Sequence, residues 1–379
     1  MSKVALKKCA SYSPAELDNA IAASFLLLGG AEKFVKKGES VLLKVNALFG
    51  SKPEAAVTTH PEFLRAVIKA IKPLASKIYV ADSPGFGSFT NNAKICGFAK
   101  VAAEEGAEIA EFAEEDEIEC VNPLNFKKFK VSALINRVDK IINLPKFKTH
   151  ALMFMTLAVK NMFGIIPGFS KAGYHMRSGQ DRMLFARILV DLFRAKTPVL
   201  NIMDGVEAME GNGPGGGTVY KLGLIMMSDD GFAMDFAAAK IAGFRPEMVF
   251  TNLIYKKEVL KGAEPEIEIT GESLESVMVK DFQPVDRLGA FTPNLLKNVL
   301  YGILNPKQIY LKNKCTGCLR CVKHCPVNVL VYDPKKKITC DYNKCIKCFI
   351  CQEICPEKAI VMKESFLAPL FGRAGKAKK

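Results

Sequence analysis

The sequence lacks a hydrophobic run long enough to cross a membrane. A membrane-spanning helix needs about 20 consecutive apolar residues, whereas the longest candidate, residues 21–28, is short and follows Glu16 and Asp18. The first residues do not show a signal-peptide pattern either. The sequence therefore predicts a protein without a membrane span.

The usual nucleotide-binding signatures are also missing. The chain contains no G-x-G-x-x-G placed before a helix and no G-K-[ST], the patterns whose backbone N–H groups cradle phosphate groups. The most glycine-dense loop, residues 211–217, follows three carboxylates, which would repel phosphate unless cations compensated them. Two interpretations of this loop stay open: a surface turn, or a segment whose glycines permit close backbone approach to another group.

Cysteine, in contrast, is plentiful and ordered. Eight of the 12 cysteines form two runs with the spacing C-x2-C-x2-C-x3-C, each followed by proline. Three thiolates at this spacing can hold three corners of one [4Fe-4S] cube, and the fourth points toward a neighbouring cube. Zinc sites and disulfide frameworks use other spacings. The runs consist of Cys315, Cys318, Cys321 and Cys325, and of Cys345, Cys348, Cys351 and Cys355.

This segment resembles the bacterial two-cluster ferredoxins over its whole length. The resemblance implies that Cys315, Cys318, Cys321 and Cys355 hold one [4Fe-4S] cluster and that Cys345, Cys348, Cys351 and Cys325 hold the other. Cysteine use of this kind is typical of a reducing compartment. We therefore expect a cytoplasmic protein, from an anaerobe.

Positive charge is concentrated in the same segment. The net charge is +14, and the residues from 306 onward carry 14 Lys and 2 Arg against 2 Asp and 3 Glu, a net +11. A basic face around the clusters would attract an acidic redox partner protein. The alternative is a solvated turn at 335–337 and a disordered tail at 373–379. The segment lacks the interleaved aromatic residues of nucleic-acid-binding surfaces, which argues against nucleic acid as a partner.

The first 300 residues alternate strand-like and helix-like patterns. This alternation indicates an α/β fold with a largely parallel sheet and flanking helices. We expect an α/β domain over residues 1–300, a small α+β ferredoxin-like domain over 301–364, and a basic tail over 365–379. Residues 154–163 are predicted to be helical, and residues 204–217 to form a loop.

Two predicted loops follow strands at residues 77–81 and 140–144. The first begins with Asp82, and the second contains Lys146, Lys148 and His150. In open α/β sheets, the loops at the carboxyl ends of strands line the ligand crevice. Both loops are therefore candidate walls of a binding site.

Residues 143–175 carry a second resemblance. The strings N-L-P-K-F-K-T-H at 143–150 and T-L-A-V-K-N-M-F-G at 156–164, together with Pro167-Gly168 and His175, look like the iron–sulfur family called domain of unknown function 362. The likeness extends to residues 81–85 and 204–213. That family commonly pairs this domain with a two-cluster ferredoxin segment, so the resemblance adds architecture more than chemistry.

A looser similarity concerns the order His150, Lys160, Pro167-Gly168 and His175. It is similar to the nickel-pincer lactate racemase family, in which a lysine carries the covalent cofactor and a later histidine binds nickel. The glycine-rich run that precedes the lysine in that family is replaced here by residues 154–159.

Lys160 is flanked by apolar residues, and partial burial would lower its pKa and call for an anionic partner. Lys160 either reaches solvent or pairs with an acid such as Asp82 or Asp204, or it binds an anion or takes part in catalysis. We predict catalytic roles for His150, Lys160 and His175. The residues predicted to bind a second cofactor, of unknown identity, are Asp82, Lys146, Lys148, Asp204, Gly211 and Gly213.

Two functions fit this pattern. In the first, the protein is an oxidoreductase whose clusters pass single electrons to or from a small-molecule substrate or cofactor in the α/β domain. In the second, it is a non-catalytic electron carrier or assembly module that docks a redox partner. A plain ferredoxin needs far less chain than this, so the large domain favours the first.

Overall fold

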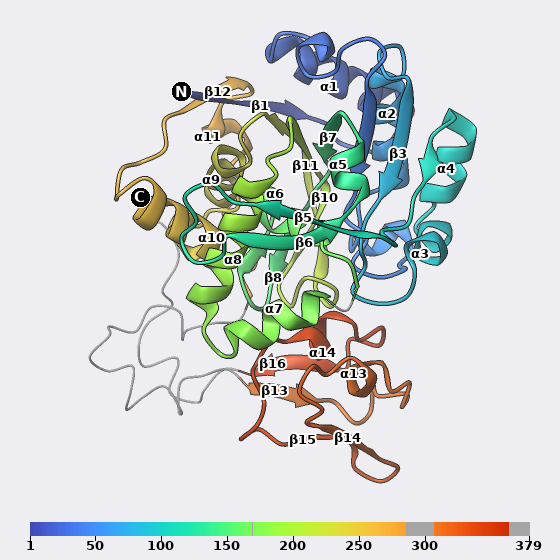
Figure 1. Cartoon of the computed structure of the whole chain (residues 1–379), viewed down its shortest axis with the longest axis vertical. Helices are drawn as coiled ribbons and strands as arrows, with labels where there is room; N and C mark the ends of the chain where they lie inside the picture. Colours follow the sequence, from blue (N-terminus) through green and yellow to red (C-terminus); the bar gives the residue numbers. More distant parts are fainter. Residues whose placement is uncertain (169, 286–306, 364–379) are drawn as a thin grey trace.

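The computed structural model describes residues 1–168, 170–285 and 307–363. These residues form a large α/β unit and a small cysteine-rich unit (Figure 1). The predicted domain boundary near residue 300 and the predicted basic tail lie outside the described residues.

The large unit is built on one sheet, which has ten strands among the described residues. Neighbouring strands follow the order β12-β1-β11-β10-β7-β2-β3-β4, and β8 and β9 extend the sheet beside β10. Most pairings are parallel, including β2 with β3 and β7, whereas β11 is antiparallel to β1 and β10. The α/β prediction is confirmed. The strands are β1 (Ser2–Lys8), β2 (Ser40–Lys44), β3 (Lys77–Ala81), β4 (Glu108–Ile109), β7 (Lys140–Asn143), β8 (Lys146–His150), β9 (Phe154–Thr156), β10 (Leu200–Glu210), β11 (Thr218–Ser228) and β12 (Ile267–Gly271).

The helices of the large unit form two packed groups. Helix α2 contacts both α1 and α4, and α6, α8, α9 and α10 form the second group. A separate antiparallel hairpin of β5 (Glu115–Glu119) and β6 (Lys128–Ser132) lies outside the main sheet. The helices are α1 (Pro14–Leu27), α2 (Pro61–Ile71), α3 (Phe89–Ile95), α4 (Phe98–Glu105), α5 (Leu134–Arg137), α6 (Ala158–Asn161), α7 (Ser170–Ser178), α8 (Arg182–Ala195), α9 (Gly231–Ile241), α10 (Phe250–Ile254) and α11 (Leu274–Val277).

Three predicted elements are wrong. Residues 146–150 were expected in a loop, but they form β8, which pairs with β9 and β10. Residues 154–163 were expected to be helical, but they form β9, the short α6 and the start of a 3₁₀ turn, Met162–Ile165. Strand β9 pairs with β8, so sheet hydrogen bonds override the local helical pattern. Residues 204–210 were expected in a loop, but they continue β10, because β8 and β11 offer hydrogen bonds on both sides.

The strand order creates a crevice at the ends of β2 and β7. These strands are neighbours, but the chain leaves β2 toward β3 on one side and leaves β7 toward β10 on the other. Connections that diverge in this way leave a crevice at the carboxyl ends of the strands, where open α/β sheets bind ligands.

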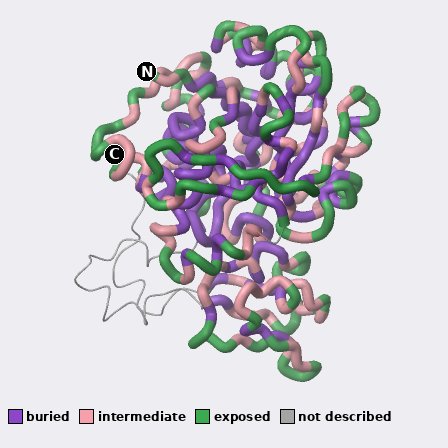
Figure 2. The backbone as a smooth tube through the Cα atoms, viewed as in Figure 1, coloured by how far each residue is buried: buried purple, intermediate pink, exposed green. Residues whose placement is uncertain are grey.

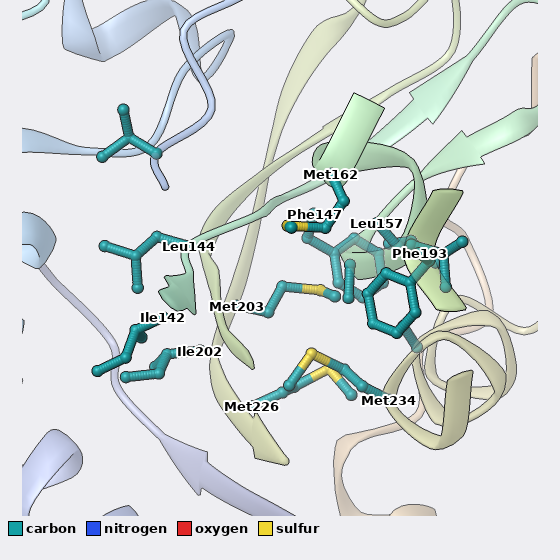
Figure 3. Close-up of a cluster of buried hydrophobic side chains, with 14 of the residues drawn as sticks. Ile142, Leu144, Phe147, Leu157, Met162, Phe193, Ile202, Met203, Met226 and Met234 are labelled. Atoms are coloured by element: carbon teal, nitrogen blue, oxygen red, sulfur yellow. The ribbon is translucent and has the colours of Figure 1, made fainter. Parts of the chain in front are cut away.

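The core lies between the sheet and its helices. Figure 2 shows that buried residues are concentrated in the large unit. In Figure 3, Met203 of β10 and Met226 of β11 lie close to Met234 of α9, with Phe193 beside them, and all of them are fully or almost fully buried. Strands covered on both faces are nearly continuous apolar runs in sequence, which explains why the sequence predicts the central strands well.

The two cysteine runs of the small unit have similar backbone conformations as well as similar sequences. Leu319 and Phe349, at equivalent positions of the two cysteine runs, both have a φ of 61° immediately before α13 and α14. Asn328 and Lys358 are a second equivalent pair, with φ of 52° and 49°. The elements are β13 (Lys307–Tyr310), α13 (Arg320–Lys323), β14 (Leu330–Asp333), β15 (Lys337–Cys340), α14 (Ile350–Glu353) and β16 (Ile360–Lys363), with β13 paired to β16 and β14 to β15.

Candidate functional site

A cavity of about 590 Å³ lies between the two units. Its volume falls in the usual range for small-molecule sites. The large unit contributes residues at the ends of β2, β3 and β8 and from α6 and α7, so the cavity opens from the crevice at the sheet. The residues contributed by the small unit are Lys323, His324, Cys325, Pro326, Ile350, Glu353 and Ile354.

Five of the site residues predicted in the large unit line this cavity: Asp82, Lys148, His150, Lys160 and His175. The structure thus brings together side chains from β8, α6, α7 and the loop after β3. The remaining cofactor-binding candidates of the large unit lie elsewhere and are described below. The roles assigned to all of these residues stay predictions.

Asp82 forms a buried ion pair that the sequence did not reveal. Its Oδ1 lies 2.7 Å from Nζ of Lys44, the last residue of β2, and its Oδ2 accepts a 2.7 Å hydrogen bond from the N–H of Ala47. Burial lowers the pKa of Lys44, and the Asp82 carboxylate opposes this shift. The only sequence signal was a lysine at the end of an otherwise apolar strand.

Lys148 and Lys171 are held by oxygen acceptors. Nζ of Lys148 donates to Oδ1 of Asn46 at 2.8 Å and to the carbonyl of Val57 at 2.6 Å, and Nζ of Lys171 donates to the carbonyl of Ser83. Burial, with the nearby positive charge of Lys160, lowers the pKa of Lys148 to about 7. Burial also lowers the pKa of Lys171 to about 7. Sequence reasoning missed Lys171, which lies in the polar helix α7.

Lys160 differs from these two lysines. Its Nζ lies 5.9 Å from the centroid of the Phe163 ring, and among the described residues its ammonium has neither a hydrogen bond nor an ion pair. Burial lowers the pKa of Lys160, and the charges of Glu353 and Asp82 oppose this shift. The N–H donors of the Lys160 ammonium therefore have no acceptor among the described residues.

The segment that carries Lys160 is fixed from both sides. Asp235 of α9 accepts hydrogen bonds of 2.8 and 3.1 Å from the first two N–H groups of α6. The Asn161 side chain accepts from Asn46 at 2.8 Å and donates to Asn143 at 2.7 Å. These bonds place Lys160 rigidly at the ends of β2 and β7.

His150 connects the two units. Its Nδ1 accepts a 2.9 Å hydrogen bond from the N–H of Leu152, so the proton of the neutral ring is on Nε2. Nε2 lies 3.0 Å from Oε1 of Glu353 in α14. Burial raises the pKa of Glu353, whereas His150 and the nearby Lys160 lower it to about 2, so the carboxylate is ionised. Sequence reasoning missed Glu353 because it lies inside the cysteine run.

His175 packs between aromatic rings. Its ring stacks on Phe185, with 4.4 Å between centroids, and meets Phe163 edge-on at 5.6 Å. Burial lowers the pKa of His175 to about 4, so the ring is neutral at pH 7. Its buried Nδ1 has no hydrogen-bond partner among the described residues.

Lys146 and Asp204 lie in a separate buried cluster. Nζ of Lys146 lies 2.8 Å from Oδ2 of Asp204 and donates to the Tyr12 hydroxyl at 2.7 Å. The same hydroxyl donates to Oδ1 of Asp204 at 2.8 Å. The backbone N–H of His60 completes the set at 2.9 Å from Asp204. The polar groups of this cluster are thus hydrogen-bonded to one another. Neither Lys146 nor Asp204 lines the cavity.

The glycine-dense loop contacts the small unit. Gln352 donates to the carbonyl of Asn212 at 3.0 Å, and Lys358 donates to the carbonyl of Gly217 at 3.0 Å. A Cβ at Gly213 would collide with the Thr149 backbone, and one at Gly215 would lie 2.7 Å from the carbonyl oxygen of Glu353. Gly211, the remaining cofactor-binding candidate, accepts from the Thr149 hydroxyl at 2.9 Å. Gly215 therefore permits close approach of the small unit's backbone, whereas Gly213 permits close approach of β8 within the large unit.

We predict that Gly215→Ala loosens the contact between the units. The new methyl would meet the Glu353 carbonyl and the Phe49 ring at 2.9 Å, and overpacking of this kind costs about 1–3 kcal/mol. Hydrogen exchange at the amides of α14 should therefore accelerate about tenfold or more. Gly173→Ala is the control, since nothing lies within 4 Å of its Cβ position. Equal exchange in both variants would contradict this docking role.

All 12 cysteines are free. A cavity of about 20 Å³ is lined by Cys315, Cys318 and Cys321 of the first run and by Cys355 of the second. The N–H of Val329 donates to Sγ of Cys325 at 3.4 Å, and the equivalent N–H of Ala359 donates to Sγ of Cys355 at 3.3 Å. Hydrogen bonds to sulfur of this kind tune the potentials of iron–sulfur clusters.

In the part of the chain that the structure describes, no three His, Cys, Asp or Glu side chains converge as they would around a single metal ion. A four-iron cube is held differently, by four cysteine thiolates spread around the cluster.

Comparison with known proteins shows which family this chain belongs to. Residues 41–240 match the family described as Domain of unknown function (DUF362), and residues 314–359 match a 4Fe-4S dicluster domain. The chain belongs to the DUF362 family. Its ferredoxin-type domain makes this DUF362 protein an iron–sulfur electron-transfer protein. The resemblance to the DUF362 family and the ferredoxin-type character of the cysteine-rich segment are thereby confirmed.

A curated relative of this DUF362 protein is a thylakoid-associated protein of Synechocystis sp. The two are 36% identical over 251 residues, which cover 66% of this chain and 78% of the relative. Among the described residues, no helix is both long and apolar enough to span a bilayer.

Two solved structures show weak similarity to the DUF362 protein. The lactate racemase apoprotein from Thermoanaerobacterium thermosaccharolyticum has a TM-score of 0.42 and 9% identity, with 64% of this chain and 57% of the racemase covered. A structural-genomics target from Thermotoga maritima has a TM-score of 0.36 and 10% identity, with 52% and 51% covered. Nothing about activity follows from similarity at this level.

Proposed function

We propose that this DUF362 protein is an iron–sulfur oxidoreductase in which two [4Fe-4S] clusters pass single electrons to or from a small molecule in the cavity between the units. One observation carries the proposal: Cys325, a predicted cluster ligand, lines the same cavity as His150, Lys160 and His175. A molecule bound there would contact both a cluster ligand and the predicted catalytic side chains.

Three observations support two clusters. The thiols are free, the backbone of each cysteine run repeats the other, and Cys355 shares a small cavity with three cysteines of the first run. The proposed ligands are Cys315, Cys318, Cys321 and Cys355 for one cluster, and Cys345, Cys348, Cys351 and Cys325 for the other. When bound, the clusters would supply single electrons at potentials set by their surroundings.

The chain's own residues would bind the molecule and move protons. Lys160 and Lys171 offer N–H donors to a negatively charged group. His150 holds a proton on Nε2, directed at Glu353, and His175 is neutral with an unpaired ring nitrogen. Imidazole side chains can accept and deliver protons, which electron transfer to an organic molecule commonly requires.

A second candidate function is a non-catalytic electron carrier or assembly module. Cys318 is exposed, and the nearby Lys312 and Lys314 are exposed as well. Basic side chains beside an accessible cluster ligand suit docking of an acidic redox partner. The same surface would also serve the oxidoreductase, as the place where electrons enter. We extend the proposal to a cytoplasmic location in an anaerobe.

Anaerobic purification tests the proposal. We expect about eight iron and eight sulfide per chain, together with a small molecule that mass spectrometry identifies after denaturation. Addition of this molecule should reoxidise the reduced clusters or reduce the oxidised ones, and His150→Ala and Lys160→Ala should lose this turnover. The same iron content without any redox-active molecule, or unchanged turnover in both variants, would favour the electron-carrier function instead.

A further inference from the structure

The charges in the cavity do not balance. Among the described residues that line or adjoin it, Asp82 is paired with Lys44 at 2.7 Å, and Glu353, which accepts from the His150 ring at 3.0 Å, adds one further negative charge. Three lysines of the large unit that line the cavity, Lys148, Lys160 and Lys171, have no ion pair among the described residues. These lysines therefore outnumber the one lining carboxylate, Glu353, that is not paired with a lysine or arginine.

Lys160 has the most to gain from a ligand. Its ammonium group lacks any polar partner among the described residues, whereas Lys148 and Lys171 already donate to amide or carbonyl oxygens. An ammonium at the wall of a cavity is stabilised by an anion placed beside it, because the anion supplies the missing counter-charge. A buried group points to the same conclusion, because Nδ1 of His175, another lining residue, has no hydrogen-bond partner among the described residues.

Part of the remaining wall of the cavity is apolar. Phe86 and Phe163 line it from the large unit, and Ile350 and Ile354 line it from the small unit. Ring and aliphatic walls gain free energy by covering an apolar body, at about 25 cal/mol per Å². An inorganic anion alone would leave most of a space of about 590 Å³ unfilled.

We infer that the ligand of this cavity is an organic oxyanion, a carboxylate or a phosphate ester with an apolar body, whose charged group is anchored by Lys160. Lys171 and Lys148 provide further positive charge beside it, and the apolar body packs against the ring and aliphatic walls. This inference deepens the proposed function, since it concerns the same cavity. Binding of an anion can be measured without electron transfer. A failure of the anion-binding inference can therefore be told apart from a failure of the proposed oxidoreductase function.

Anaerobic calorimetry on the full-length holoprotein tests the anchor. Phenylacetate and phenyl phosphate serve as the two anionic probes, and benzyl alcohol as the uncharged control. We expect at least one anion to bind and benzyl alcohol not to bind. Lys160→Met should weaken the binding at least tenfold, because it keeps length but removes charge, and Lys160→Arg should retain it.

Lys257→Met is the matched control, because Lys257 is exposed in the π-helical turn Tyr255–Val259 after α10 and does not line the cavity. It should bind like the wild-type protein. The inference is overturned if neither anion binds, if benzyl alcohol binds equally well, or if Lys160→Met keeps the wild-type affinity. A preference for one probe decides between carboxylate and phosphate ester.

The affinity for phenylacetate should fall as pH rises. Lys148 and Lys171, with pKa values of about 7 in the free protein, are mostly ammonium at pH 6 and mostly neutral at pH 8.5. Of the other groups that face them, His175 titrates well below this window, Asp82 stays paired with Lys44, and Lys146 stays paired with Asp204. Lys160 and Glu353 are the remaining charged neighbours. We expect at least tenfold weaker binding at pH 8.5 than at pH 6. An affinity that is constant or rises with pH would contradict the anchoring by lysines.

Discussion

Cys325→Ala is expected to reduce the iron content from about eight to about four atoms per chain. Cys325 belongs to the first cysteine run, yet the proposed ligation assigns it to the cluster of the second run. Loss of one thiolate should therefore remove the cluster beside the cavity and leave the other in place. Because Cys325 lines the cavity, electron exchange with a bound molecule should be lost as well. Iron and sulfide analysis with a redox titration measures both effects.

Cys340→Ala is the matched control for this variant. Cys340 ends β15 in the same unit and packs against the cysteine cluster, but it belongs to neither proposed ligand set. It should keep about eight iron atoms. If Cys325→Ala also keeps the full iron content, or if it loses all iron, the exchange of ligands between the two runs is wrong.

The sequence predicts the fold best where burial is complete. Strands β2, β3 and β7 lie inside the sheet, and their apolar runs appear in the sequence almost without interruption. The helix predicted for residues 154–163 is wrong for a different reason. Their local pattern suits a helix, but Thr156 pairs with Lys148 across the sheet, and this pairing is not encoded in the segment itself.

The sequence also predicts part of the candidate site. His150, Lys160 and Asp82 belong to recognisable strings at strand ends, and the structure brings them to one cavity. Glu353 and Lys171 were missed because their importance depends on contacts between distant segments. Glu353 lies in the cysteine run, and only the docking of the two units brings it to His150.

The glycine-dense loop shows a further limit of the sequence. Glycine at this density indicates that another group approaches closely, but it does not indicate which group. In the structure, Gly215 lies against the backbone of Glu353, so the approaching group is the protein's own second unit. A single sequence without that unit's position would not distinguish this contact from a phosphate site.

Asp204→Asn is expected to destabilise the large unit by about 3–5 kcal/mol. Asp204 and Lys146 are 0% and 1% exposed and lie 2.8 Å apart, so the variant leaves a buried ammonium without its counter-ion. Urea unfolding followed by circular dichroism measures the loss. Glu258→Gln is the control, since it breaks a 2.7 Å pair with Arg187 whose side chains are 23% and 30% exposed. Pairs of that kind contribute about 1 kcal/mol or less.

The double variant Asp204→Leu with Lys146→Met separates two explanations of this loss. If the cost of Asp204→Asn comes from the stranded Lys146 charge, removal of both charges should recover most of the stability, because apolar replacements of buried pairs are often nearly neutral. If the cluster instead holds a cofactor, the double variant should fold well but lose the small molecule recovered on denaturation. Retention of that molecule, with recovered stability, would assign Lys146, Asp204 and Tyr12 to the architecture of the sheet rather than to the site.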